Sequence, residues 1–248
     1  MLYLLRKKAL KGGLIVLFFL LAQNAGISQF NYYTRTDLNR LEQDAKPYYF
    51  GISLGVNLAR FQTDLHPRFL ADDSVFVAEP GNSGGLALGF QATARLSNRF
   101  QVRFNPQLMF IERNIHYTLK YPDIEGSTDI NKAVESIIIS FPVHIKFQSD
   151  RIGNFRVYTL AGIKADIDMA SNARKQKAED LVKIDKYDWG PEFGIGFNFY
   201  FPSFIFSPEI KISNGMRNLH DRDANLKYSS VFDKIQSRMI IFTIHLEG

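Results

Sequence analysis

Apolar and polar residues alternate with a period of two in eight segments of this chain. Successive side chains of a β-strand point to opposite faces, so this alternation predicts strands with one apolar and one polar face. Between Phe50 and Ala59, for example, Phe, Ile, Leu and Val alternate with Gly, Ser and Asn. Each segment has about the length of a membrane-crossing strand. We expect the strands at residues 50–59, 85–96, 100–110, 137–148, 155–166, 188–199, 204–213 and 239–246.

The two faces of these segments differ as a membrane barrel requires. The apolar face is rich in Phe, while the other is rich in Gly, Ser and Asn, which suit a narrow interior better than a solvated exterior. We therefore expect an all-β fold, an eight-stranded antiparallel up-and-down transmembrane β-barrel. The alternative is a soluble lipocalin-like barrel, whose apolar face would surround a ligand. Aromatic residues near the strand ends are typical of a membrane-interface girdle: Tyr48, Tyr49, Tyr187, Trp189 and Tyr200.

The connections between the segments alternate in length. The gaps after the even-numbered segments are short: 97–99, 149–154 and 201–203. The gaps after the odd-numbered segments are long: 62–83, 120–133, 170–186 and 215–231. Short periplasmic turns and long extracellular loops are typical of bacterial outer-membrane barrels. We therefore expect the protein to be integral to the cell outer membrane, with the long connections outside the cell.

Four prolines fall inside the expected strands: Pro106, Pro142, Pro191 and Pro208. Proline cannot donate the hydrogen bond that a strand ladder needs, so it is usually confined to bulges, strand starts or sheet edges. We expect these four residues to lie at bulges or near strand ends.

The N-terminal residues have the order of a secretory signal peptide. Four cations and no acid precede an apolar stretch from Leu14 to Ala22, and small and polar residues follow it. The apolar stretch is about half of the ~20 residues that a membrane-crossing helix needs, so a permanent anchor is the weaker interpretation. We divide the chain into a signal peptide at 1–28, a periplasmic N-terminal segment at 29–47 and an outer-membrane β-barrel domain at 48–248.

Composition and charge exclude several classes of protein. The chain has no cysteine, which excludes a lipid-modified N-terminal cysteine and a disulfide-stapled scaffold. Its 30 basic residues outnumber its 25 acidic ones, but four of the basic residues lie in the expected signal peptide, which leaves a nearly neutral mature chain. Because a nucleic-acid-binding protein needs a clustered basic face, we expect no nucleic acid partner.

Charged residues occupy the polar face of several segments and would point into the barrel. Ions are costly in a medium of low dielectric constant unless they pair, so we expect an interior plug of ion pairs that closes the barrel. The alternative is a charged path for a solute, but the interior of an eight-stranded barrel is about filled by side chains. The expected plug comprises Arg95, Arg103, Lys146, Arg156, Lys164, Asp166, Glu192, Glu209 and Lys211.

Signals for catalysis are weak. The five histidines lack the spacing of metal ligands, and the glycine-rich residues 80–85 lack the lysine of a phosphate-binding loop. We expect no enzymatic activity, catalytic residue, cofactor or metal. One alternative stays open, because some eight-stranded outer-membrane barrels modify lipids with a Ser/His pair, and His66 and Ser74 share one long connection.

A set of short motifs spans nearly the whole mature chain, at residues 103–108, 112–113, 135–142, 151–158, 161–162, 200–202, 206–211 and 242–247. Together these motifs resemble the PorT family of Bacteroidetes outer-membrane proteins. The resemblance implies a component of the type IX secretion system, which moves folded proteins across the outer membrane and supports gliding in some species. Such proteins are often labelled protein-translocating porins, but the family supplies no catalytic residue.

A barrel closed by its own side chains cannot pass a folded protein. We therefore expect an accessory or assembly function, with outer-membrane lipid and other type IX secretion subunits as partners. Two other hypotheses remain: a barrel that binds a ligand or surface partner through its loops, and the lipid-modifying enzyme.

Overall fold

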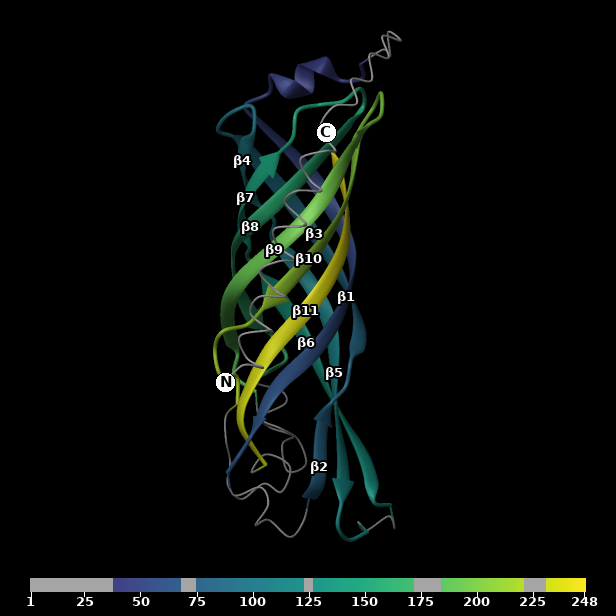
Figure 1. Ribbon diagram of the computed structural model, residues 1–248, viewed down its shortest axis with the longest axis vertical. Helices are drawn as coiled ribbons and strands as arrows, with labels where there is room; N and C mark the ends of the chain where they lie inside the picture. Colours follow the sequence, from purple (N-terminus) through teal and green to yellow (C-terminus); the bar gives the residue numbers. More distant parts are fainter. Residues whose placement is uncertain (1–37, 68–74, 123–126, 172–183, 221–230) are drawn as a thin grey trace, which may run out of the picture. The chain divides into compact units, whose positions relative to one another are not determined.

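The computed structural model describes residues 38–67, 75–122, 127–171, 184–220 and 231–248 (Figure 1). The expected signal peptide at 1–28 lies outside these residues, as do parts of all four long connections. No helix in the described part of the chain has the length and apolar character needed to cross a membrane.

The described residues form one short 3-10 helix, η1 (Leu41–Asp44), and a single antiparallel sheet of eleven strands. The strands are β1 (Tyr48–Leu65), β2 (Val75–Pro80), β3 (Ser83–Arg95), β4 (Phe100–Phe104), β5 (Gln107–Leu119), β6 (Asp129–Ser140), β7 (Val143–Gln148), β8 (Phe155–Asp168), β9 (Tyr187–Tyr200), β10 (Ile205–Asn214) and β11 (Phe232–Glu247).

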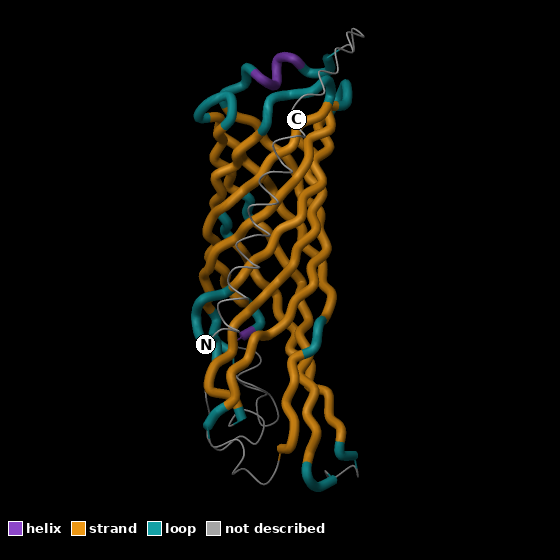
Figure 2. The backbone as a smooth tube through the Cα atoms, viewed as in Figure 1, coloured by secondary structure: helices purple, strands orange, loops and turns teal. Residues whose placement is uncertain are grey.

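The sheet closes on itself into a barrel (Figure 2). The first and last strands pair along most of their length, from Gly51 opposite Glu247 to Leu65 opposite Phe232. Around the ring, β1 is followed by β3, by β4 and β5, by β6 and β7, and then by β8, β9, β10 and β11. With β4 and β5, and β6 and β7, each counted as one interrupted strand, the ring has eight strands. The expected all-β, eight-stranded antiparallel barrel is confirmed.

One strand of the described sheet was not expected from the sequence. β2 lies within the long connection 62–83 and pairs with β5, from Val75 opposite Leu119 to Pro80 opposite Ile115. It adds an edge to the sheet beyond the closed ring. It has only six residues, too few for an apolar–polar alternation to distinguish a strand from a loop.

Prolines explain why two strands are interrupted. Asn105 and Pro106 separate β4 from β5, and Phe141 and Pro142 separate β6 from β7. The two breaks lie side by side, because Phe104 pairs with Val143. The backbone N–H of Asn105 donates to the carbonyl of Pro142 at 3.2 Å, so a hydrogen bond still joins the two chains at the breaks. The expectation of irregular positions is right for Pro106 and Pro142.

The same expectation is wrong for Pro191 and Pro208, which lie inside β9 and β10. Pro191 keeps its place opposite Ile163, and Pro208 opposite Ile244. Each strand thus tolerates a proline while its register continues in one of its two ladders, β8–β9 for Pro191 and β10–β11 for Pro208. Pairing is lost only in the β9–β10 ladder, which skips from Phe206 to Glu209.

The barrel has two unlike ends. At one end, which we call the turn end, lie the short connections 96–99, 149–154 and 201–204 together with η1 (Figure 1). At the other, which we call the loop end, the strands lead into the long connections. Gly153 has φ +59°, a left-handed conformation that glycine adopts without steric cost, and so allows the tight connection between β7 and β8.

Between the two ends, the faces are arranged as expected, with apolar side chains outward and polar side chains inward. Phe90 is 71% exposed on the outside of β3, whereas the neighbouring Gln91 is 1% exposed inside. The expected aromatic girdle is right for Tyr48, Tyr187 and Trp189, which point outward. It is wrong for Tyr49 and Tyr200, which are each 4% exposed, because the strand period places them on the inward face.

The strands extend past their expected limits at the loop end, and there the polarity of the two faces reverses. Outward positions become polar, as at Arg60, Glu112 and Arg238, while inward positions become apolar. The reversal fits water around the outside of the extension, with the apolar side chains forming a core within. That core comprises Phe61, Val75, Ala78, Ile115, Tyr117, Leu119, Val134, Ile184, Leu219, Val231, Phe232 and Ile235.

Candidate functional site

The charged residues of the barrel interior form the candidate site, because charge in a buried position needs a specific arrangement. All nine residues of the expected plug have inward positions on their strands. Eight of them are buried, and Arg95, near the turn end, is half-buried. The strand period accounts for this placement, since each of these residues alternates with an outward apolar neighbour.

Arg103 on β4 lies at the centre of the charged network. Its guanidinium donates to Glu209 Oε2 at 2.6 Å and to Glu247 Oε1 at 3.3 Å. The Tyr158 hydroxyl donates to the same Glu209 oxygen at 2.7 Å. Gly196 makes room for that tyrosine, because a Cβ at this position would overlap the Tyr158 ring. Four different strands thus converge on one arginine–glutamate contact.

Two lysines extend the network. The ammonium of Lys211 lies 3.9 Å from a carboxylate oxygen of Glu192 and 3.9 Å from one of Glu209. The ammonium of Lys146 lies 4.0 Å from Glu247 Oε1 and 3.8 Å from the centre of the Tyr158 ring. A ring face attracts a cation, which helps to compensate for the burial of this lysine.

Two histidines lie against the same carboxylates. His144 Nε2 is 2.8 Å from Glu192 Oε2, and His245 Nε2 is 3.4 Å from Glu209 Oε1. Counting Arg103 and the two lysines against Glu192, Glu209 and Glu247, the network has three cations and three carboxylates. With both histidines neutral its charges balance, as burial in a medium of low dielectric constant requires.

A second, smaller cluster lies nearer the loop end. Lys164 forms an ion pair with Asp166, and the Ser140 hydroxyl donates to Asp166 Oδ1 at 2.5 Å. Next to it, the guanidinium carbon of Arg113 lies 4.9 Å from the centre of the Phe61 ring. The charged interior meets the apolar core at this contact. The cavity that Arg113 and Asp166 help to line holds only about 10 Å³, enough for about one water molecule.

The turn end is covered by residues 38–46, which cross the barrel with η1 (Figure 1). Asp44 is held by arginines: Arg156 Nη1 donates to Asp44 Oδ1 at 3.0 Å, and Arg151 Nη1 to Asp44 Oδ2 at 3.4 Å. Arg95 Nη2 donates to the carbonyl of Gln43 at 2.9 Å. Two of the nine expected plug residues, Arg95 and Arg156, thus bind this N-terminal cap rather than the central network.

Replacing Asp44 by asparagine should loosen the cap, because it removes the charge that three arginines, Arg95, Arg151 and Arg156, share. We expect the opening of residues 38–46 to become easier by about 1 kcal/mol, roughly a fivefold faster amide hydrogen exchange. The matched control is Glu42→Gln, which changes an exposed side chain in the same short helix. Equal exchange in both variants would show that Asp44 does not hold the cap.

Sequence reasoning missed three residues of this arrangement and the apolar core at the loop end. Glu247 continues the inward positions of Thr243 and His245, so the period of the last strand could have revealed it. Tyr158 also has an inward position, but a tyrosine gives no sign that it pairs with a glutamate. Asp44 carried no signal, because it precedes the first alternating segment. The apolar core at the loop end was missed because its residues fall outside the expected strands.

Only one of the two residues considered for catalysis, His66, lies within the described part of the chain. His66 directly follows β1, and its backbone N–H donates to the carbonyl of Val231 at 2.9 Å. Ser74, its expected partner in the enzyme alternative, lies outside the described residues. No group of three or more potential metal-ligating side chains occurs within the described ranges.

Comparison with known proteins extends the structural description. The profile of one family, described as "Outer membrane protein beta-barrel domain", matches residues 22–221. No curated protein sequence matches the chain.

Among solved structures, the chain is similar to Neisserial surface protein A, at 10% identity over 79% of this chain and 96% of that chain, with a TM-score of 0.40. It is also similar to OprG of Pseudomonas aeruginosa, at 14% identity over 79% of this chain and 93% of that chain, with a TM-score of 0.37. A third is the outer membrane protease OmpT of Escherichia coli, at 9% identity over 81% of this chain and 95% of that chain, with a TM-score of 0.36.

Proposed function

The chain belongs to the family of outer membrane protein β-barrel domains, and we propose that it acts as a sealed component of the type IX protein secretion machinery. It is an integral protein of the outer membrane. The proposed function in type IX secretion rests on the resemblance of its motifs to the PorT family. In this proposal the turn end faces the periplasm, the loop end faces the outside, and the protein is not an enzyme.

The observation that carries the proposal is the filled interior. The N-terminal cap covers the turn end, the charged network fills the middle, and the apolar core fills the loop end. A folded cargo protein has no route through such a barrel. The function that fits is therefore structural: the barrel fixes other secretion subunits in the membrane, or assists their assembly, while cargo crosses elsewhere.

The sealed interior has a direct electrical consequence. We expect the purified protein to give no conductance steps in a planar lipid bilayer. The double variant Arg103→Ser/Tyr158→Ser should give small steps, because it removes two large side chains that meet Glu209. Steps of equal size in both proteins would contradict the seal.

Deletion of the gene tests the secretion function. We expect cargo proteins that carry the type IX signal to fail to reach the cell surface in the deletion strain, and to return when the intact protein is supplied. An unrelated outer-membrane protein, measured in the same cells, controls for general damage to the membrane. Normal surface cargo in the deletion strain would contradict the proposal.

A second function, binding of a surface partner at the loop end, is favoured by the shape of β5 and β6. These strands stay paired well beyond the outward apolar belt, to Thr118 opposite Asp129, and β2 adds a third strand beside them. Figure 1 shows this three-stranded projection extending from the barrel. Replacing residues 112–135 by a short turn should abolish partner binding in this case while secretion stays intact.

A further inference from the structure

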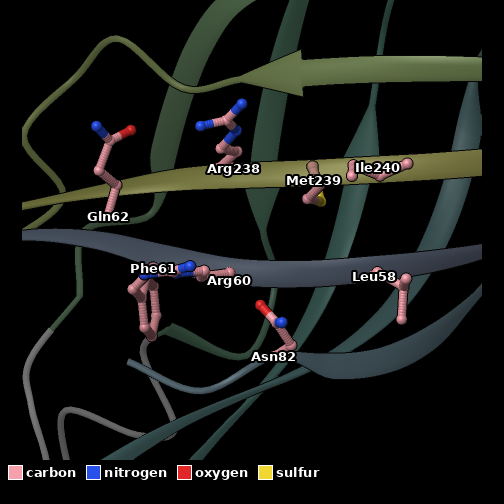
Figure 3. Close-up of a pocket in the computed structure, with 8 residues that line it drawn as sticks. All are labelled: Leu58, Arg60, Phe61, Gln62, Asn82, Arg238, Met239 and Ile240. Atoms are coloured by element: carbon pink, nitrogen blue, oxygen red, sulfur yellow. The ribbon is translucent and has the colours of Figure 1, made fainter. Parts of the chain in front are cut away.

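Two arginines lie directly opposite each other on the outer surface, where the polarity of the faces reverses. Arg60 on β1 pairs in register with Arg238 on β11, and both side chains are exposed. Figure 3 shows them on adjacent strands, together with Asn82 from the connection between β2 and β3. Arg60, Arg238 and Asn82 line a hollow of about 380 Å³, and Leu58 and Ile240 are also part of its wall.

Among the residues that the structure describes, no acidic side chain pairs with either of these two cations. Within the described residues, no ion pair or hydrogen bond joins either guanidinium to another side chain. Like charges directly opposite on adjacent strands repel each other. The nearest acid along the same face of β1 is Asp64, which lies opposite Lys234. Glu112 has an outward position at the same level, but β3 separates its strand from β1. An anion from outside the chain would remove the repulsion.

The position of the pair indicates which anion this is. Leu58 and Ile240 are the last outward apolar residues of their strands before the two arginines, and each is exposed. In the membrane they contact acyl chains, so the arginines lie at the level of the lipid headgroups. The hollow thus has an apolar part beside the hydrocarbon and a cationic part beside the headgroups, and Gln62 and Asn82 add amide donors.

We propose that Arg60 and Arg238 form a binding site for the phosphate group of a membrane lipid whose acyl chains lie against Leu58 and Ile240. Guanidinium groups suit this ligand, because their planar donors can each form two hydrogen bonds with phosphate oxygens. Two adjacent guanidinium groups can bind one phosphate from both sides. This site does not depend on the secretion function, since it uses only the outer surface of the barrel.

The test uses the full-length protein in detergent and phosphorylated lipid A as the probe. Native mass spectrometry measures how much lipid stays bound as its concentration is raised. We expect the double variant Arg60→Gln/Arg238→Gln to bind the lipid about tenfold more weakly, which is about 1.4 kcal/mol. The charge-preserving variant Arg60→Lys/Arg238→Lys should keep part of the affinity.

The matched control is Arg99→Gln/Arg217→Gln, which also removes two exposed cations but at other places on the surface. It should bind lipid A as the unchanged protein does. A shift of the folded band on unheated electrophoresis gels confirms that each variant still forms a barrel.

Three results would overturn the proposal. The first is unchanged binding by the Arg60→Gln/Arg238→Gln variant. The second is equal affinity of the unchanged protein for lipid A with and without its phosphates. The third is displacement of lipid A by inorganic phosphate at the same concentration as by the lipid itself, which would mean that the site takes free phosphate and has no lipid preference.

Discussion

Replacement of Arg103 by alanine is expected to destabilise the folded barrel by about 3–5 kcal/mol, because it leaves buried carboxylates without their cation. Arg103 contacts both Glu209 and Glu247, and all three side chains are almost fully buried. The measurement is the urea-induced unfolding of the protein in lipid vesicles. The control is Arg99→Ala, which removes an exposed ion pair with Asp150 and should cost less than about 1 kcal/mol.

The double variant Arg103→Ala/Glu209→Gln separates pairing from packing. If Arg103→Ala lowers stability because it leaves a carboxylate unpaired, removing one carboxylate as well should restore part of the lost stability. A loss that stays the same or grows would indicate that Arg103 acts mainly by filling space. Equal stability of Arg103→Ala and the unchanged protein would contradict the existence of the network.

Replacement of Phe242 by arginine is expected to destabilise the barrel by about 2–4 kcal/mol, because it places a charge on the lipid-facing surface. Phe242 is exposed on β11 and lies opposite Val56 and Ile210, which are also exposed apolar residues. This places it well within the outward apolar belt. Unfolding in lipid vesicles again provides the measurement.

The control for Phe242→Arg is Asn131→Arg, on the outward face of β6 beyond the belt. We expect it to change stability by less than about 1 kcal/mol, since the new charge would remain in water or among headgroups. If the two variants were equally stable, the belt would not contact hydrocarbon.

The sequence predicts the barrel well because the lipid and the interior impose opposite demands on alternate residues. In β1, every second residue from Phe50 to Leu58 is apolar and outward, so the period alone shows which face meets the membrane. The nine charged residues could be placed in the interior for the same reason. Their partners could not be named, because the distance between β4 and β10 across the barrel depends on the closed ring.

Two kinds of feature could not be predicted, and each has a physical cause. Tyr49 and Tyr200 have the chemistry of interface residues, but the strand period is stronger than this preference and turns them inward. At the loop end, the alternation continues with its polarity reversed, so residues such as Phe61 and Ile115 look like parts of an irregular loop. A search for alternation of either polarity would have extended the strands.

The most direct test of the lipid-facing surface uses Trp189, the only tryptophan of the chain, which is 55% exposed on the outside of β9. Its fluorescence is measured in vesicles of lipids that carry bromine on their acyl chains, and again with the water-soluble quencher acrylamide. The outward apolar belt predicts strong quenching by the brominated lipids and weak quenching by acrylamide. Strong quenching by acrylamide with none by the brominated lipids would contradict it.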